Sequence, residues 1–138
     1  METKTLIARL KDYKILKAEI KNIELNIEEL REDISVSGIS YEERPAPTNK
    51  FNSAVENDAI RLAERTTELE KGKRRREREI ERIDNALSIL NEKEREVLIL
   101  KHIKDYKWDT VTYTLDRCYS VCKDIEAEAL RKIQRFFS

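Results

Sequence analysis

The chain has 138 residues, of which 39% are hydrophobic and 41% are charged, with only two glycines and two prolines. This composition is typical of long solvated helices and argues against a β-sandwich or barrel, while the apolar content suffices for a thin core. The 28 basic and 28 acidic residues cancel. A nucleic-acid contact would therefore have to come from a local arrangement and not from bulk charge.

The sequence indicates where the protein acts and which cofactors it lacks. No apolar run approaches the roughly 18 residues of a membrane span, and the N-terminus lacks the apolar stretch of a signal peptide, so we expect a cytoplasmic protein with no membrane partner. Cys118 and Cys122 have no histidine or third cysteine at zinc spacing. We therefore expect no metal, no cofactor, and two small buried thiols in a reducing compartment.

Residues 2–35 repeat apolar side chains at helical spacing, with one series every seven residues and a second series three positions later. The two series are Tyr13, Ile20, Ile27 and Ile34, and Leu16, Ile23 and Leu30. Such an a/d pattern predicts a helix that packs against a partner helix.

The pattern stops at residues 35–50, which contain Gly38, Pro45 and Pro47. Proline blocks helix propagation because it lacks a backbone donor and clashes with the preceding turn. The sequence therefore predicts a long loop here, either functional or disordered.

Residues 51–90 predict a second long helix, in which Val55, Leu62, Leu69, Ile83 and Leu90 lie at multiples of seven. Thr66, Lys73 and Arg76 interrupt this seam, and Gly72 lies within the interruption. Residues 1–90 are thus expected to form a helical hairpin or coiled coil. The first helix can fold back on the second or pair with another subunit, and both alternatives remain open.

The basic run at residues 71–78 allows two interpretations. Clustered cations could hold phosphates. However, neighbouring residues of a helix point in different directions, and Glu70, Glu77, Glu79 and Glu81 supply partners at three- and four-residue spacing. A solvated, self-paired helix face is the favoured interpretation.

Residues 91–138 predict a helix-turn-helix domain. Asn91 and Glu94 have the spacing of a capping box, so a helix is expected to start near residue 92. A short second helix covers 108–115, a tight turn covers 116–118, and a third helix begins near Tyr119. Its predicted buried stripe is Cys122, Ile125, Ala129 and Ile133. Trp108, Phe136 and Phe137 are expected in the small core.

In a helix-turn-helix, the outward residues near the start of the second motif helix enter the major groove. The candidates for base contacts are Tyr119, Ser120, Lys123, Asp124 and Ala127. The candidates for phosphate contacts are Lys101, Arg117, Arg131 and Lys132.

Residues 88–133 closely resemble region 4, the DNA-binding end of bacterial sigma factors. The matching residues are 94–98 (Glu-Arg-Glu-Val-Leu), Leu115 with Asp116, and 125–133 (Ile-Glu-Ala-Glu-Ala-Leu-Arg-Lys-Ile). The chain departs from the family between Tyr119 and Asp124, where the family carries several Arg, Glu or Gln residues. The resemblance thus implies a sigma-type framework that recognises a different DNA element, because bidentate donors for guanine are missing.

The order of a helical coil, a proline-containing loop and a region-4-like end resembles phage transcriptional regulators of the ArpU/RinA type. Residues 40–57 (Ser-Tyr-Glu-Glu-Arg-Pro-Ala-Pro-Thr-Asn-Lys-Phe-Asn-Ser-Ala-Val-Glu-Asn) also resemble a motif of that group. The resemblance implies control of late genes in phages and prophages of low-GC Gram-positive bacteria.

We therefore expect a homo-oligomeric regulator of double-stranded DNA, not an enzyme. His102, the single histidine, has no catalytic partners in sequence, and two glycines cannot form a phosphate-binding loop. Two alternatives remain. A DNA-packaging protein of the small-terminase type also joins a helix-turn-helix to an oligomerising part, but generally in the reverse order. A coiled-coil adaptor would bind RNA polymerase through its sigma-like end.

Overall fold

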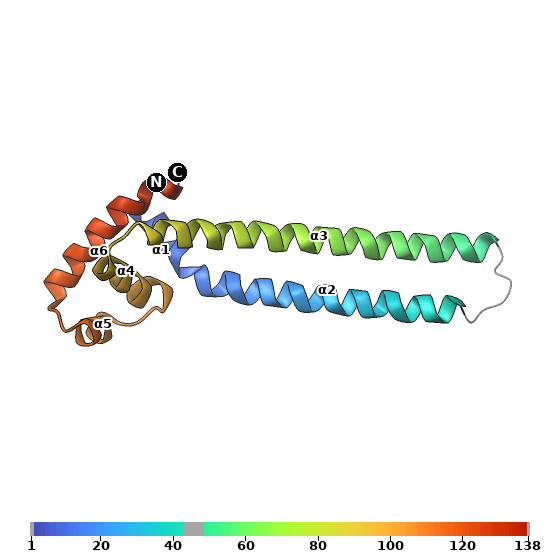
Figure 1. Cartoon of the computed structure of the whole chain (residues 1–138), viewed down its shortest axis with the longest axis horizontal. Coiled ribbons are helices and arrows are strands. Elements are labelled where there is room, and N and C mark those ends of the chain that lie inside the picture. Colours follow the sequence, from blue (N-terminus) through green and yellow to red (C-terminus); the bar gives the residue numbers. More distant parts are fainter. Residues whose placement is uncertain (1, 43–48, 138) are drawn as a thin grey trace. The chain divides into compact units, whose positions relative to one another are not determined.

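The computed structural model describes the backbone of residues 2–42 and 49–137, and the side chains of residues 2–33 and 56–137. These residues confirm the predicted all-α fold. The elements are α1 (Thr3–Lys11), α2 (Tyr13–Glu42), α3 (Asn49–Ser88), α4 (Glu92–Leu98), the π-helix η1 (Ile99–Ile103), α5 (Trp108–Leu115), α6 (Tyr119–Ile133) and the 3-10 helix η2 (Gln134–Phe137) (Figure 1). Within the described ranges, no helix is both long and apolar enough to cross a membrane.

The N-terminal region differs from the prediction in two ways. The expected helix over 2–35 is divided at Asp12 into α1 and α2. The predicted loop over 35–50 is wrong at both ends, because α2 continues to Glu42 and α3 begins at Asn49. A glycine such as Gly38 costs a helix interior about 1 kcal/mol but keeps its backbone donor, so the helix passes through it. Pro45 and Pro47 lie outside the described residues.

The chain forms two compact units, and α2 and α3 each contribute residues to both of them. The first unit comprises residues 1–18 and 77–138, and the second comprises residues 19–76. The predicted division at residues 90 and 91 differs from these units, because the chain's first helix and the end of α3 pack with the C-terminal helices.

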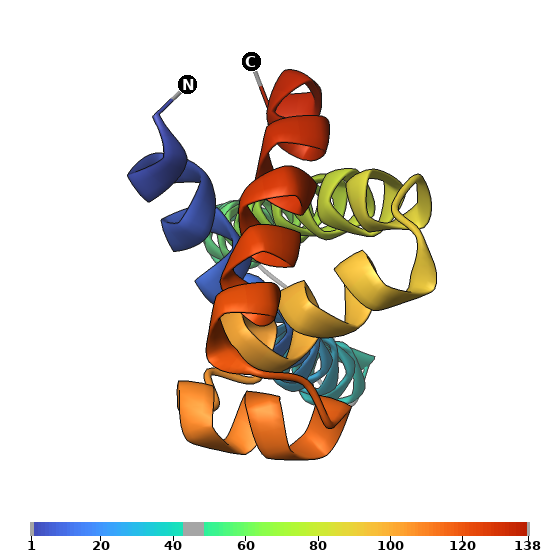
Figure 2. The same ribbon diagram turned by 90° about the vertical axis from the view of Figure 1, so that its left-hand side faces the viewer.

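The first unit is built around one core to which six elements contribute, namely α1, α3, α4, η1, α6 and η2. In Figure 2, α6 lies between α1 on one side and α4 on the other. Leu10, Ile83, Leu98 and Ile133 are fully buried there, although they lie far apart in the sequence. The complete buried cluster is Leu6, Leu10, Ile83, Ala86, Leu87, Leu90, Leu98, Ile103, Ala129, Leu130, Ile133 and Phe137. Non-local burial of this kind, and not helix propensity, stabilises short helices such as α1.

The second unit is an antiparallel pair formed by parts of α2 and α3 of the same chain. Ile23 and Ile27 of the predicted seam are buried. Two of the three polar residues that interrupt the seam of α3 contact glutamates of α2: Lys73 Nζ lies 3.2 Å from Glu24 Oε1, and Arg76 forms an ion pair with Glu19. Part of the basic run therefore joins the two helices instead of pairing only along its own helix.

Candidate nucleic-acid interface

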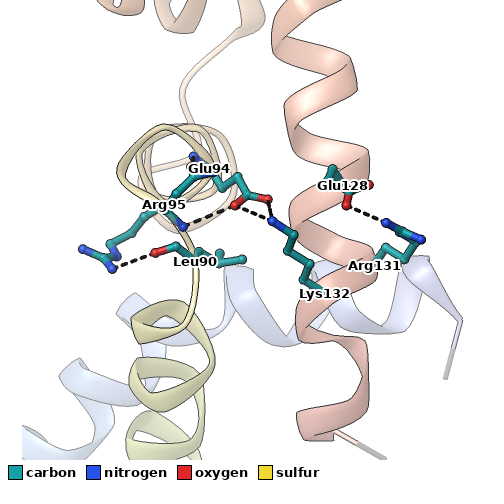
Figure 3. A network of polar contacts seen from close by, with 7 residues as sticks. Leu90, Glu94, Arg95, Glu128, Arg131 and Lys132 are labelled. Atoms are coloured by element: carbon teal, nitrogen blue, oxygen red, sulfur yellow. Dashed lines mark hydrogen bonds and ion pairs between the residues drawn. The ribbon is translucent and has the colours of Figure 1, made fainter.

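The start of α4 is fixed by the predicted capping box. The side chain of Asn91 accepts a hydrogen bond from the backbone N–H of Glu94 at 2.9 Å, and Glu94 Oε1 accepts from the backbone N–H of Asn91 at 3.2 Å. Lys132 of α6 donates to the same carboxylate at 3.0 Å (Figure 3). Glu94 therefore caps α4 and also joins it to α6.

The neighbouring Arg95 closes the bend between α3 and α4. Its guanidinium donates to the carbonyl oxygen of Leu90 at 2.9 Å (Figure 3) and to that of Leu87 at 3.1 Å. Carbonyls at a helix C-terminus have no partner within the helix, and a cation there also opposes the helix dipole. Glu94 and Arg95 thus have structural roles at this bend: Glu94 caps α4, and Arg95 binds the carbonyl oxygens that precede it.

The turn between α5 and α6 depends on a left-handed residue. Asp116 has φ 51° and ψ 48°, and the backbone N–H of Arg117 donates to the Thr112 carbonyl at 3.2 Å. Aspartate tolerates this conformation better than most residues other than glycine. The predicted bounds of the short helix over 108–115, and the start of the next helix at Tyr119, are confirmed.

Helix α6 has one buried and one exposed face. Cys122, Ala129 and Ile133 are fully buried and Ile125 is partly buried, as the predicted stripe requires. The five candidates for base contacts all lie on the exposed face: Tyr119, Ser120, Lys123, Asp124 and Ala127. Their accessibility is observed, whereas their contact with bases stays a prediction.

Trp108, at the start of α5, is contacted by side chains from two other elements, η1 and α6. Its ring centroid lies 5.3 Å from the Nζ of Lys101, 5.2 Å from the Nζ of Lys123 and 5.6 Å from the Tyr119 ring, which meets it edge to face. The prediction that Trp108 fills the core is wrong, because its side chain is only partly buried. Trp108 instead joins a predicted phosphate contact to two predicted base contacts.

A buried ionisable pair lies behind this cluster. His102 Nε2 of η1 is 2.8 Å from Glu126 Oε2 of α6, and Lys123 Nζ is 3.5 Å from Glu126 Oε1. Burial alone raises the pKa of Glu126, but the hydrogen bond and charge of His102, with the charge of Lys123, outweigh burial and leave the pKa below its ordinary value. Sequence reasoning missed this pair because the two residues are 24 positions apart.

The four candidates for phosphate contacts do not lie together. The ammonium group of Lys101 lies over the Trp108 ring, and Arg117 lies in the turn before α6. Arg131 and Lys132 lie near the other end of α6, about 18 Å from Tyr119 at 1.5 Å per residue. There Arg131 forms an ion pair with Glu128, and Lys132 binds Glu94 (Figure 3). Of the four candidates for phosphate contacts, only Lys101 and Arg117 thus lie near the start of α6.

The two cysteines differ in environment. Cys122 is fully buried, but Cys118 is exposed because it lies in the turn before α6, so the expectation of two buried thiols is wrong for Cys118. Among the residues whose side chains the structure describes, no three His, Cys, Asp or Glu residues are grouped so that they could hold a metal ion.

Comparison with known proteins gave no match to a protein-family model, to a curated protein or to a solved structure.

Proposed function

We propose that the protein is a sequence-specific transcriptional regulator that binds double-stranded DNA through the exposed face of α6. In this proposal it acts in the cytoplasm of a bacterial host on late promoters of a phage or prophage, as the ArpU/RinA and sigma region-4 resemblances imply. Helices α5 and α6 form the helix-turn-helix, and α4 with η1 supports it from behind.

The observation that carries the proposal is the cluster of Trp108, Tyr119, Lys101 and Lys123 at the exposed start of α6. A helix-turn-helix contacts bases with the N-terminal residues of its second helix, where Tyr119 and Lys123 lie. Lysine can donate to guanine acceptors or phosphates, and tyrosine can donate to phosphates. Glu94 and Arg95 support this region by holding the bend before α4 and joining α4 to α6.

The charge of the chain predicts how this surface binds. Formal net charge is zero, and the cluster region also carries Asp109, Asp116 and Asp124. Few counterions are then released on binding, so a single copy gains little affinity from phosphates. We therefore propose a homo-oligomer whose copies occupy neighbouring half-sites, which doubles the number of contacts.

A gel-shift titration of the full chain tests the proposal, with duplex DNA from the genomic region around the gene as the probe. Tyr119→Ala and Lys123→Glu should weaken binding by about tenfold each, the range of one good base contact. Lys11→Glu makes the same charge change at an exposed lysine of α1 and serves as the control. Equal binding by both α6 variants and the wild type would refute α6 as the reading helix.

One observation favours a second function, the RNA polymerase adaptor. Tyr113 of α5 is 88% exposed, far more than any other large apolar or aromatic side chain that the structure describes. Exposed tyrosines are common at protein interfaces, because the ring is apolar and the hydroxyl polar. If the adaptor function holds, Tyr113→Ala weakens capture of purified RNA polymerase, while Tyr119→Ala and Lys123→Glu leave the capture unchanged.

A further inference from the structure

Two ionisable side chains are buried together in the first unit. His102 is 4% exposed and Glu126 is 8% exposed, and their nearest atoms are 2.8 Å apart. Charged residues are rarely buried unless they are paired, because a carboxylate loses its hydration without compensation. The pair is also hard to separate, since removing one member leaves the other buried and alone. The pair therefore holds the Glu126 side chain of α6 against His102 of η1.

The second oxygen of Glu126 reaches toward the surface. Glu126 Oε1 lies 3.5 Å from the Nζ of Lys123, whose side chain is 45% exposed. The same ammonium group lies 5.2 Å from the centre of the Trp108 ring, within the range of a cation–π interaction. A single carboxylate thus connects a buried histidine to an exposed cation in the cluster around Trp108.

We infer that Glu126 is a positioning residue that holds Lys123 against Trp108, with His102 as the anchor of Glu126, so that the lysine is ordered before DNA arrives. The inference rests on the proposed function. A free lysine side chain samples many rotamers, and ordering it on binding costs affinity. A lysine held in advance avoids this cost and presents its ammonium in one geometry, which favours one acceptor over others. The partner is an acceptor on duplex DNA, either a base edge or a phosphate.

The first test needs no DNA, because Trp108 is the single tryptophan and its emission reports on Lys123 directly. Lys123→Met removes the ammonium and keeps most of the side chain, and Glu126→Gln removes the charge that holds it. Each variant should shift the emission maximum of Trp108 in the same direction. The double variant should shift it no further than either single variant, since contacting residues are not additive. Additive shifts, or no shift in Glu126→Gln, overturn the inference.

Glu128→Gln is the matched control, because Glu128 is also on α6 but pairs with Arg131. It should leave the emission of Trp108 unchanged. Circular dichroism reports whether each variant is folded. If Glu126→Gln does not fold, NMR of the wild-type chain replaces it. The ring current of Trp108 should then move the Lys123 methylene proton resonances upfield of those of Lys11, and random-coil shifts for Lys123 overturn the inference.

The second test measures discrimination between DNA from around the gene and a shuffled duplex of equal length. Lys123→Met and Glu126→Gln should reduce the ratio of the two dissociation constants by the same factor, about three- to tenfold, while Lys123→Arg retains most of it. If the wild-type chain does not discriminate, the proposed function fails even where the emission shifts coincide. If it discriminates and Glu126→Gln keeps the full ratio, the positioning role fails alone.

Discussion

Arg9 and Glu79 form a two-bond ion pair that joins α1 to α3. Arg9 Nε donates to Glu79 Oε1 at 2.8 Å, and Nη2 donates to Oε2 at 2.7 Å. The third nitrogen, Nη1, donates to the carbonyl of Phe137 at 3.1 Å, and the guanidinium lies 4.8 Å from the centre of the Phe137 ring. One side chain of the first helix thus holds the end of α3 and the C-terminal η2 together.

Arg9→Met should lower the free energy of unfolding by about 1–2 kcal/mol, because it breaks charge-assisted bonds between partly buried groups. Arg82→Met is the control: Arg82 pairs with the same carboxylate, at 2.9 Å, but is about half exposed. Its loss should stay below about 0.5 kcal/mol. Urea denaturation followed by circular dichroism measures both values, and equal losses would contradict this account of Arg9.

Stability should fall in acid because of Glu79. The hydrogen bond from Arg9, more than any other influence, lowers the pKa of Glu79 below its ordinary value of 4.5. The folded chain then binds this proton less readily than the unfolded chain, so the stabilisation is complete well above 4.5 and is lost as the pH falls through 4.5 toward the lowered value. The urea midpoint should drop as the pH falls from about 5 to about 3, and Glu79→Gln should reduce the drop.

The turn before α6 should tolerate glycine and reject valine. Asp116 has a left-handed backbone with φ 51°, which costs a β-branched residue about 1–2 kcal/mol. Asp116→Val should therefore destabilise the chain by about that amount, and Asp116→Gly should be neutral or slightly stabilising. Thermal unfolding of the two variants provides the measurement. A larger loss for glycine than for valine would mean that the aspartate side chain, not the backbone angle, matters here.

The core of the first unit should respond to truncation far more than the surface of the second. Leu98 has no exposed area, and Leu25 is 50% exposed. Leu98→Ala should cost about 2–5 kcal/mol, because a cavity remains where the side chain packed. Leu25→Ala should cost less than about 1 kcal/mol. Similar urea midpoints for the two variants would contradict the observed core.

Local sequence signals predicted the C-terminal elements accurately. The capping box of Asn91 and Glu94 fixes the start of α4 through bonds between residues three positions apart, so spacing alone reveals it. Asp116 marks the turn for the same reason, since the residue type reflects its own backbone angle. Helical periodicity predicted the buried apolar stripe of α6. The residues on the opposite side of the helix were therefore predicted to be exposed.

Features that depend on distant parts of the chain could not be predicted. The end of α2 could not be predicted from Gly38, because the low helix propensity of one glycine is a weak guide in a long helix. The partly exposed position of Trp108 could not be predicted, because its spacing in the sequence gives no sign of the lysines beside it. The His102–Glu126 pair arises only when η1 packs near α6, and no local pattern encodes that contact.

The central claim is that the start of α6 binds DNA, and the emission of Trp108 tests it most directly. Trp108 lies against Tyr119 and Lys123, so a duplex bound there must change its surroundings. On titration of the full chain with duplex DNA from around the gene, we predict a saturable change in Trp108 emission that Tyr119→Ala weakens and a shuffled duplex produces only at much higher concentration. An emission spectrum that stays constant while the same DNA is bound would place the contact elsewhere and contradict the claim.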